Sequence, residues 1–183
     1  MNQYTRPVAG GINRLRSLML LLSLLVVSCA GGVRTPQIRV PDFDSQDYRL
    51  IWPLPISTTA RITSPFGRRK DPFTGMQRFH GGVDLDGVTG DPVYSAGAGE
   101  VIFSGERSGY GLMIIIDHGK GLNSYYGHCS KLLKSRGKKV NRGEIIALLG
   151  STGRSSGSHL HFETRKHGQP FDPVLILPRL KKL

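Results

Sequence analysis

Residues 112–128 read LMIIIDHGKGLNSYYGH, and this stretch decides the class of fold. Its first six residues form a nearly continuous run of apolar, mostly β-branched side chains, which predicts a buried strand over 112–117. The glycines at 119 and 121 predict a turn, and residues 122–128 then form the next strand. Consecutive strands joined by so short a turn are typical of an antiparallel sheet.

The same pattern of short apolar runs between Gly, Pro and Asp turns extends in both directions from residue 51 onward. Further strands are expected over 92–96, 100–103, 144–149 and 159–165. Only residues 130–136 have modest helical potential. The sequence therefore predicts one mainly β domain over residues 51–178, built as an antiparallel β-sheet with short loops.

The amino-acid composition excludes several classes of protein. The chain of 183 residues has 25 Lys and Arg against 13 Asp and Glu, a formal charge of +12. Its two cysteines exclude a disulfide scaffold and a Cys-rich zinc module. The 24 glycines show no Gly-X-Y period, which excludes collagen. A basic surface favours an anionic polymer as partner, such as nucleic acid, acidic lipid or an acidic cell wall.

The N-terminus has the features of an export signal. Arg14 and Arg16 precede an apolar run from Leu18 to Val27, about ten residues, where a bilayer span needs about 20. The following Val26-Val27-Ser28-Cys29 resembles the bacterial lipobox, in which the cysteine is lipidated and becomes the new N-terminus. The alternatives are an ordinary signal peptide with an incidental cysteine, or an uncleaved anchor.

The lipobox resemblance implies a signal peptide over residues 1–28, and a lipidated Cys29 that begins a tether over 29–50. A short basic tail occupies 179–183. Because Ala30 and not Asp follows the cysteine, we expect anchoring to the outer membrane, with the domain facing the periplasm. Cys129 would then stand alone, as a small core residue.

Four of the six histidines fall in positions that suggest a metal site. His80 and Asp84 lie four residues apart, and His159 and His161 lie two apart, so each pair can share one face of a strand. Two imidazoles and one carboxylate form a typical catalytic zinc set. The HExxH helix is absent, so another histidine, such as His128, would have to move the proton. Spacing alone leaves open which of His159 and His161 binds metal.

The ordered motifs resemble the lysostaphin/LytM-type zinc metallopeptidases, the cell-wall endopeptidases of bacteria. The match runs over about residues 62–173 and includes SPFGRR at 64–69, HGGVDL at 80–85, YGH at 126–128 and GSTGRSSGSHLHFE at 150–163. The resemblance implies a β-rich groove, of the duplicated hybrid motif or barrel-sandwich type, with one Zn²⁺ on its floor.

By that resemblance His80, Asp84 and His161 are the zinc ligands, and His128 and His159 are catalytic histidines that do not bind the metal. We expect His159 to act as general base and His128 to donate to the oxyanion. Glu163 continues the alternation of 159 and 161, so it is a candidate to orient a histidine.

The implied function is hydrolysis of peptide cross-links in peptidoglycan by a lipid-anchored enzyme. The D-Ala–diaminopimelate bond is expected in an organism with two membranes, and glycine bridges are the alternative in others. The alternative is a non-hydrolytic wall-binding or amidase-activating module with the same fold, against which the intact set of five residues argues. A regulatory protein acting in trans is left open. A nucleic-acid partner is not expected, because no nucleic-acid motif is found and the chain carries an export signal.

Three further expectations concern single residues. His118 has a structural role in its turn, and His167 lies in an exposed loop. For Tyr110 and Tyr126, lining of the substrate groove and packing in the core remain equal alternatives.

Overall fold

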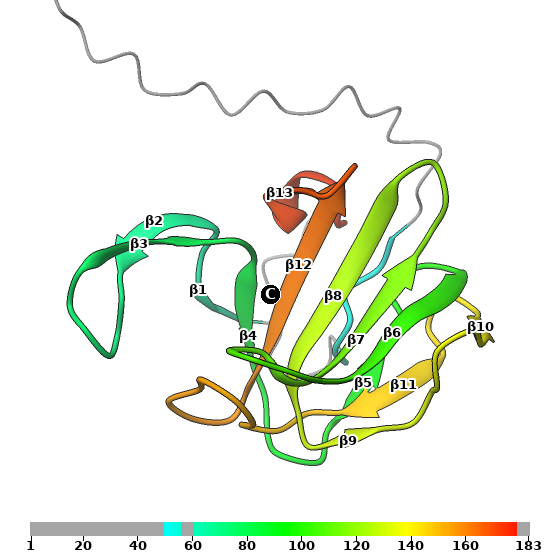
Figure 1. Cartoon of the computed structure of the whole chain (residues 1–183), viewed down its shortest axis with the longest axis horizontal. Helices are drawn as coiled ribbons and strands as arrows, with labels where there is room; N and C mark the ends of the chain where they lie inside the picture. The colour runs from blue at the N-terminus through cyan, green and yellow to red at the C-terminus, as the bar shows by residue number, and fades with distance from the viewer. Residues whose placement is uncertain (1–49, 56–60, 179–183) are drawn as a thin grey trace, which may run out of the picture. The chain divides into compact units, whose positions relative to one another are not determined.

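The structure, a computed structural model, describes residues 50–55 and 61–178 (Figure 1). These residues belong to one compact unit of the chain. None of them forms an α-helix, and the strands pair antiparallel throughout, which confirms the expected mainly β class. The predicted signal, Cys29 and the C-terminal tail lie outside the described residues. Within those residues, no helix has the length and apolar character needed to cross a bilayer.

Across residues 50–55 and 61–178, thirteen strands form three sheets, and one 3₁₀ turn lies outside them. The main sheet has eight strands, of which seven follow the order β1–β4–β12–β8–β7–β6–β10, while β13 pairs with one end of β12. Its strands are β1 (Ile62–Ser64), β4 (Val83–Asp86), β6 (Gly99–Arg107), β7 (Gly111–Asp117), β8 (Leu122–Cys129), β10 (Lys139–Val140), β12 (His159–Lys166) and β13 (Gln169–Phe171). A second sheet has β5 (Pro92–Tyr94), β11 (Ile145–Leu148) and β9 (Lys131–Leu132), and the third is the hairpin of β2 (Gly67–Lys70) and β3 (Gln77–His80). The 3₁₀ turn η1 (Pro173–Leu175) follows β13.

The strands predicted over 112–117 and 122–128 are confirmed as β7 and β8, which pair with Ile114 opposite Tyr126. One face of this pair buries Ile114, Ile116 and Tyr126 in the main core, together with residues of β4, β12 and the second sheet. The other face carries a smaller cluster around Met113, Ile115 and Tyr125. Because both faces are covered, the run from 112 to 116 is apolar throughout and does not alternate.

The helical potential of residues 130–136 is not realised. Lys131 and Leu132 form β9, which pairs with β11, and the chain turns at Gly137 with φ 83°. A segment this short has too few turns to be stable as a helix unless it buries an apolar face. Pairing with β11 satisfies its backbone instead. Cys129, immediately before this segment, is fully buried, as expected for a core residue.

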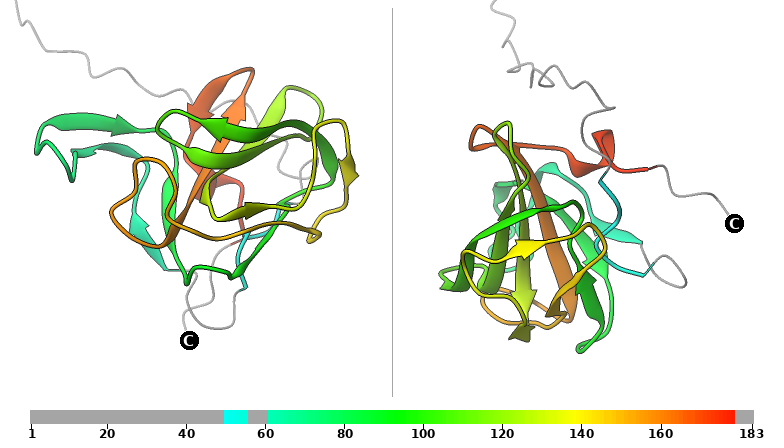
Figure 2. Two further views of the ribbon diagram at one scale, coloured as in Figure 1. Left: turned by 60° about the horizontal axis from the view of Figure 1, so that its bottom comes forward. Right: turned by 90° about the vertical axis from the view of Figure 1, so that its right-hand side faces the viewer.

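The β2–β3 hairpin and the loop before β12 lie beside β4 and β12 and line the same groove as these two strands. Figure 1 shows the hairpin extending from the top of β4, beyond the edge of the main sheet. The left view of Figure 2 shows the loop before β12 on the same side of the sheet as the hairpin. Residues of both elements line one open groove of about 650 Å³. The sequence did not predict β1, β2, β3 or β4 as separate strands, although these strands build the groove.

Candidate active site

Three strands deliver the side chains that the sequence singles out as metal ligands. His80 ends β3, Asp84 lies in β4, and His161 lies in β12 directly opposite Asp84 in the strand register. Gly81 and Gly82 connect β3 to β4. A Cβ on Gly82 would lie 2.3 Å from the carbonyl oxygen of Phe162, so only glycine lets this connection pass so close to β12. His80 and Asp84 were expected to share one face of an extended segment. They lie together because the chain bends at the two glycines between β3 and β4.

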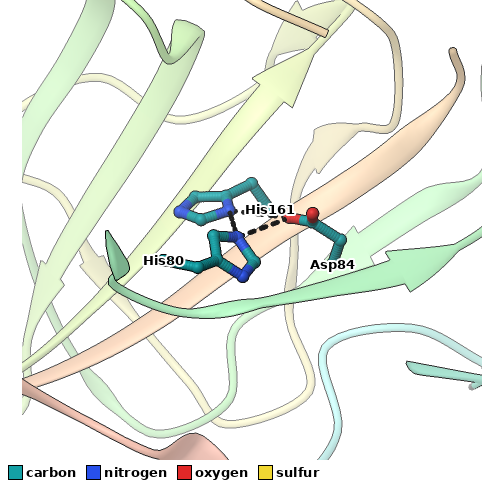
Figure 3. Close-up of side chains that lie close together, drawn as sticks. All are labelled: His80, Asp84 and His161. Atoms are coloured by element: carbon teal, nitrogen blue, oxygen red, sulfur yellow. Dashed lines mark hydrogen bonds and ion pairs between the residues drawn. The ribbon is translucent and has the colours of Figure 1, made fainter. Parts of the chain in front are cut away.

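The three side chains point at one another (Figure 3). His161 Nδ1 lies 2.8 Å from Asp84 Oδ1, and His80 Nε2 lies 3.1 Å from both of these atoms. All three residues are buried, with 7–8% of their surface exposed. Each therefore offers one ligand atom to a single small volume.

The remaining ring nitrogens determine which tautomer each histidine adopts. His80 Nδ1 lies 2.8 Å from the carbonyl oxygen of Pro65, which can only accept, so the proton of a neutral ring sits there. His161 Nε2 lies 2.9 Å from the Glu163 carboxylate and donates to it. The facing nitrogens are then left with lone pairs beside a carboxylate oxygen. Three such acceptors at one point repel unless a cation lies between them, so this donor set fits a divalent metal such as zinc.

The electrostatics of the cluster attract positive charge. Burial alone would raise the pKa of Asp84. With no cation in the cluster, the facing imidazole nitrogens can instead carry a proton and donate to Asp84, and these hydrogen bonds from His161 and His80 hold its pKa well below its usual range. Burial alone would lower the pKa of His161, yet its hydrogen bonds to the carboxylates of Asp84 and Glu163 raise it to about 9. Two carboxylates on opposite sides of one imidazole thus stabilise a cation at this position.

His128 and His159 form a pair beside the cluster of three proposed ligands, with their ring centroids 4.8 Å apart. His128 Nδ1 lies 2.7 Å from the Thr152 carbonyl oxygen, and His159 Nδ1 lies 2.9 Å from that of Gly157. Each ring donates through Nδ1, so its Nε2 is the free acceptor. His159 Nε2 lies 3.6 Å from Asp84 Oδ1, at the edge of the ligand cluster.

The backbone at His128 is unusual. Its φ of 63° lies in the left-handed region, which generally costs a residue other than glycine about 1–3 kcal/mol and occurs preferentially at functional sites. The nearby loop is fixed by close backbone contact, since a Cβ on Gly153 would lie 2.3 Å from the amide nitrogen of Gly111. Burial lowers the pKa of His128 to about 4, and the neighbouring histidines act in the same direction. His128 is therefore neutral at pH 7.

Glu163 connects the ligand cluster to a wider polar network. Its side chain is buried, and it accepts from His161 at 2.9 Å, from the Tyr110 hydroxyl at 2.7 Å and from Arg165 Nε at 2.7 Å. Burial opposes the charged form, but these donors hold the pKa of Glu163 below its usual value. An ionised Glu163 fixes the His161 tautomer and ring orientation, as carboxylates do for metal-binding histidines.

One contributor to the site, Arg69, was not identified from the sequence, and another, Tyr110, was left there with two alternative roles. Arg69 donates to the second carboxylate oxygen of Asp84 at 3.3 Å, leaving the first oxygen toward the histidines. Tyr110, for which two roles stood open, lines the groove and contacts Glu163, whereas Tyr126 lies fully buried in the core. The signal for Arg69 was weak, because no spacing relates position 69 to position 84 before the hairpin is known.

The other histidines lie outside this groove. His118 has its ring between the carbonyl oxygen of Ala98 (2.8 Å) and the hydroxyl of Ser124 (2.7 Å), and so has the structural role expected of it. His167 follows β12 with φ 48° in an exposed turn, also as expected.

Comparison with known proteins gives consistent matches. The model of peptidase family M23 matches residues 78–173, and these include the five residues of the two histidine clusters in the groove: His80, Asp84, His128, His159 and His161. The DD-carboxypeptidase/endopeptidase Mpg of Neisseria meningitidis serogroup B is 42% identical over 116 residues, which are 63% of this chain and 27% of that protein. The peptidoglycan DD-endopeptidase ShyB of Vibrio cholerae serotype O1 is 41% identical over 125 residues, 67% of this chain and 29% of that protein.

A lipoprotein NlpD/LppB homolog of Pseudomonas aeruginosa is 43% identical over 108 residues, 58% of this chain and 36% of that protein. Among solved structures, a zinc-containing peptidase from Vibrio cholerae superposes with a TM-score of 0.63 at 38% identity, covering 68% of this chain and 39% of that one. The chain thus spans about a quarter to a third of the length of the curated relatives it matches. The family model covers more than half of the chain, and the chain belongs to peptidase family M23.

Proposed function

We propose that the protein is a zinc-dependent endopeptidase that hydrolyses peptide cross-links of peptidoglycan. The observation that carries the proposal is the convergence of three ligand atoms, with two acceptor imidazoles beside them, on the floor of an open groove. Family membership supports peptide hydrolysis, and relatives named as peptidoglycan DD-endopeptidases support this substrate.

His80, Asp84 and His161 would hold the metal. When bound, zinc supplies a Lewis acid that polarises a carbonyl and acidifies water. Glu163 keeps His161 in the ligating tautomer, and Arg69 keeps the carboxylate of Asp84 in one orientation.

The two remaining histidines would move the proton. His159 presents a free Nε2 toward the ligand cluster, which is the position a general base needs to take a proton from the attacking water. His128 also presents Nε2, which carries no proton in the neutral ring. The proton that His159 takes from the water would have to pass to His128, whose ring centroid lies 4.8 Å away, before His128 could donate to the oxyanion of the scissile carbonyl. The contact of His128 Nδ1 with the Thr152 carbonyl oxygen fixes the direction of the ring.

The cross-link we propose is the D-Ala–diaminopimelate bond, in keeping with relatives that are named DD-endopeptidases. For the cell envelope we propose export, with residues 1–28 removed, Cys29 lipidated and residues 29–50 acting as a tether at the outer membrane. The likeness to a lipoprotein homolog supports this placement. The intact mass of the mature protein tests it: an N-terminal diacylglycerol on Cys29 is expected, and a Cys29→Ala variant should lack it.

The experiment for the proposed function uses purified protein and isolated cell wall. We expect release of cross-linked peptides that stops with a zinc chelator and returns with added zinc, and mass spectrometry of the products identifies the bond. If a zinc-loaded, folded protein binds the wall without cutting it, the proposal fails. A non-hydrolytic wall-binding or amidase-activating module would then be the function.

A further inference from the structure

A second charged cluster lies at the end of the groove formed by the β2–β3 hairpin. Asp71 follows β2 and is buried, with 5% of its surface exposed. Its Oδ1 accepts from the backbone N–H groups of Phe73 and Thr74, each at 3.0 Å, and from Arg154 at 2.7 Å. Its Oδ2 lies 3.5 Å from Arg78. One carboxylate therefore stands against two guanidinium groups, which leaves a net positive charge.

The two arginines have donors that the described residues do not use. The side chain of Arg78 is 63% exposed, and its interaction with the protein is the single ion pair to Asp71. Arg154 donates to Asp71 through one nitrogen, and its guanidinium carbon lies 4.6 Å from the centroid of the Phe73 ring. These two contacts fix the position of Arg154, whose side chain remains 34% exposed. A guanidinium so placed offers parallel N–H groups in the geometry that matches a carboxylate.

The arginines point into the same groove as the metal ligands. Arg78 lies opposite Arg69 in the hairpin register, which places both on one face of this two-stranded sheet. Arg69 contacts Asp84, so this is the face turned toward the candidate active site. Arg78, Arg154 and Lys70 all line the groove. Two of the carboxylates that line the groove are already engaged by basic side chains, Asp84 by the histidines and Glu163 by His161 and Arg165.

We propose that Arg78, with Arg154 beside it, forms a subsite that binds a carboxylate group of the peptide substrate. The proposal rests on the proposed function and deepens it, since it names the part of the peptide that the groove recognises. Asp71 acts as the anchor, because it holds the two arginines in place without neutralising both. The subsite sets specificity: it favours cross-linked peptides with a free carboxylate over the same peptides with that carboxylate blocked.

The test compares two substrates and two variants of the zinc-loaded protein. The substrates are a cross-linked muropeptide dimer with free carboxylates and the same dimer with those carboxylates amidated. The variants are Arg78→Gln and the matched control Arg68→Gln, which removes an exposed charge from the same hairpin at a position that does not line the groove. Melting temperature and zinc content verify that each variant is folded and loaded.

For the dimer with free carboxylates, we expect Arg78→Gln to lower kcat/KM about fivefold, mainly through KM, because an exposed guanidinium–carboxylate contact is of modest strength. For the amidated dimer the change should stay below about twofold. Arg68→Gln should leave both substrates within the same limit. The proposal is overturned if Arg78→Gln affects both dimers equally, or if Arg68→Gln has the same effect as Arg78→Gln.

Direct binding separates this proposal from the proposed function. Dissociation constants for both dimers are measured by calorimetry in a His128→Ala background, with and without Arg78→Gln. If wild-type protein cleaves neither dimer, the proposed function fails. A charge-dependent loss of affinity in Arg78→Gln would still support the subsite, and equal affinities for the two dimers would refute it.

Discussion

Two histidine networks in the described part of the molecule differ in a way that separates a proposed metal ligand from a structural residue. In the first, His118 places its ring nitrogens against the oxygens of Ala98 and Ser124, and Ser124 continues to the hydroxyl of Tyr126 at 2.8 Å. In the second, His80 and His161 each satisfy one nitrogen and turn the other toward Asp84. What distinguishes the two is the partner of the second nitrogen.

The charged groups around the two imidazole rings, His118 and His161, also differ, and they shift the two pKa values in opposite directions. Burial lowers the pKa of His118, and the Ala98 carbonyl and the more distant Asp117 only partly oppose this. For His161 the carboxylates on both sides outweigh burial and raise the pKa to about 9. The first network therefore keeps a neutral ring, whereas the second attracts a cation. Substitutions in each network sharpen this distinction.

The largest effect is expected for His161→Ala. Loss of a residue that only hydrogen-bonds a metal ligand typically weakens metal binding by about 10- to 100-fold. Removal of one of the three ligands themselves should weaken zinc binding by more than about 100-fold and abolish detectable cleavage. Zinc content by elemental analysis checks this. The matched control is His118→Gln, which should retain zinc and activity. Loss of zinc in the control would mean that the two networks are not independent.

His128→Ala should keep zinc and lose turnover. Removal of one transition-state donor costs about 10²–10³ in kcat, and none of the three ligand atoms belongs to His128. Steady-state kinetics together with zinc content decide the result. If His128→Ala loses metal and activity together, the division between ligands and catalytic histidines is wrong.

Glu163→Gln has an intermediate effect in our scheme. The amide is a weaker acceptor for the His161 N–H, so zinc affinity should fall about 10- to 100-fold while the fold is kept. Competition with a chromophoric chelator measures the affinity. Glu144→Gln is the control, because Glu144 pairs with Lys134 and does not line the groove. Equal affinities in the two variants would exclude an orienting role for Glu163.

The smallest effect concerns His118 and pH. Its folded-state pKa is lowered, so below about pH 6.5 the unfolded chain binds a proton that the folded protein does not. The free energy of unfolding should therefore fall as pH decreases from about 6.5 toward the folded-state pKa, by at most about 1.4 kcal/mol per pH unit. His118→Gln should be less sensitive over this window, as measured by denaturant titration. An identical pH dependence in both proteins would contradict the assignment.

The sequence predicted the strands of the core and the residues of the candidate metal cluster, but not the geometry around them. A continuous apolar run identifies β7 because burial on both faces requires it, whereas β8 and β12 are identified by their lengths and by the glycine turns beside them. The hairpin of β2 and β3 has little buried apolar surface, with Phe73, Met76 and Phe79 exposed, so its pattern carries no comparable signal. Contacts such as Arg69 with Asp84 depend on where this hairpin folds, which local spacing does not encode.

The central place of β12 between β4 and β8 also determines when the proposed metal site is complete. Asp84 and His161 are separated by 77 positions along the chain, and His80 and His161 by 81. Before β12 pairs with β4, the chain brings together only His80 and Asp84 of the three proposed ligands. The complete set of ligands therefore depends on the pairing of β12 with β4, and not on either local segment.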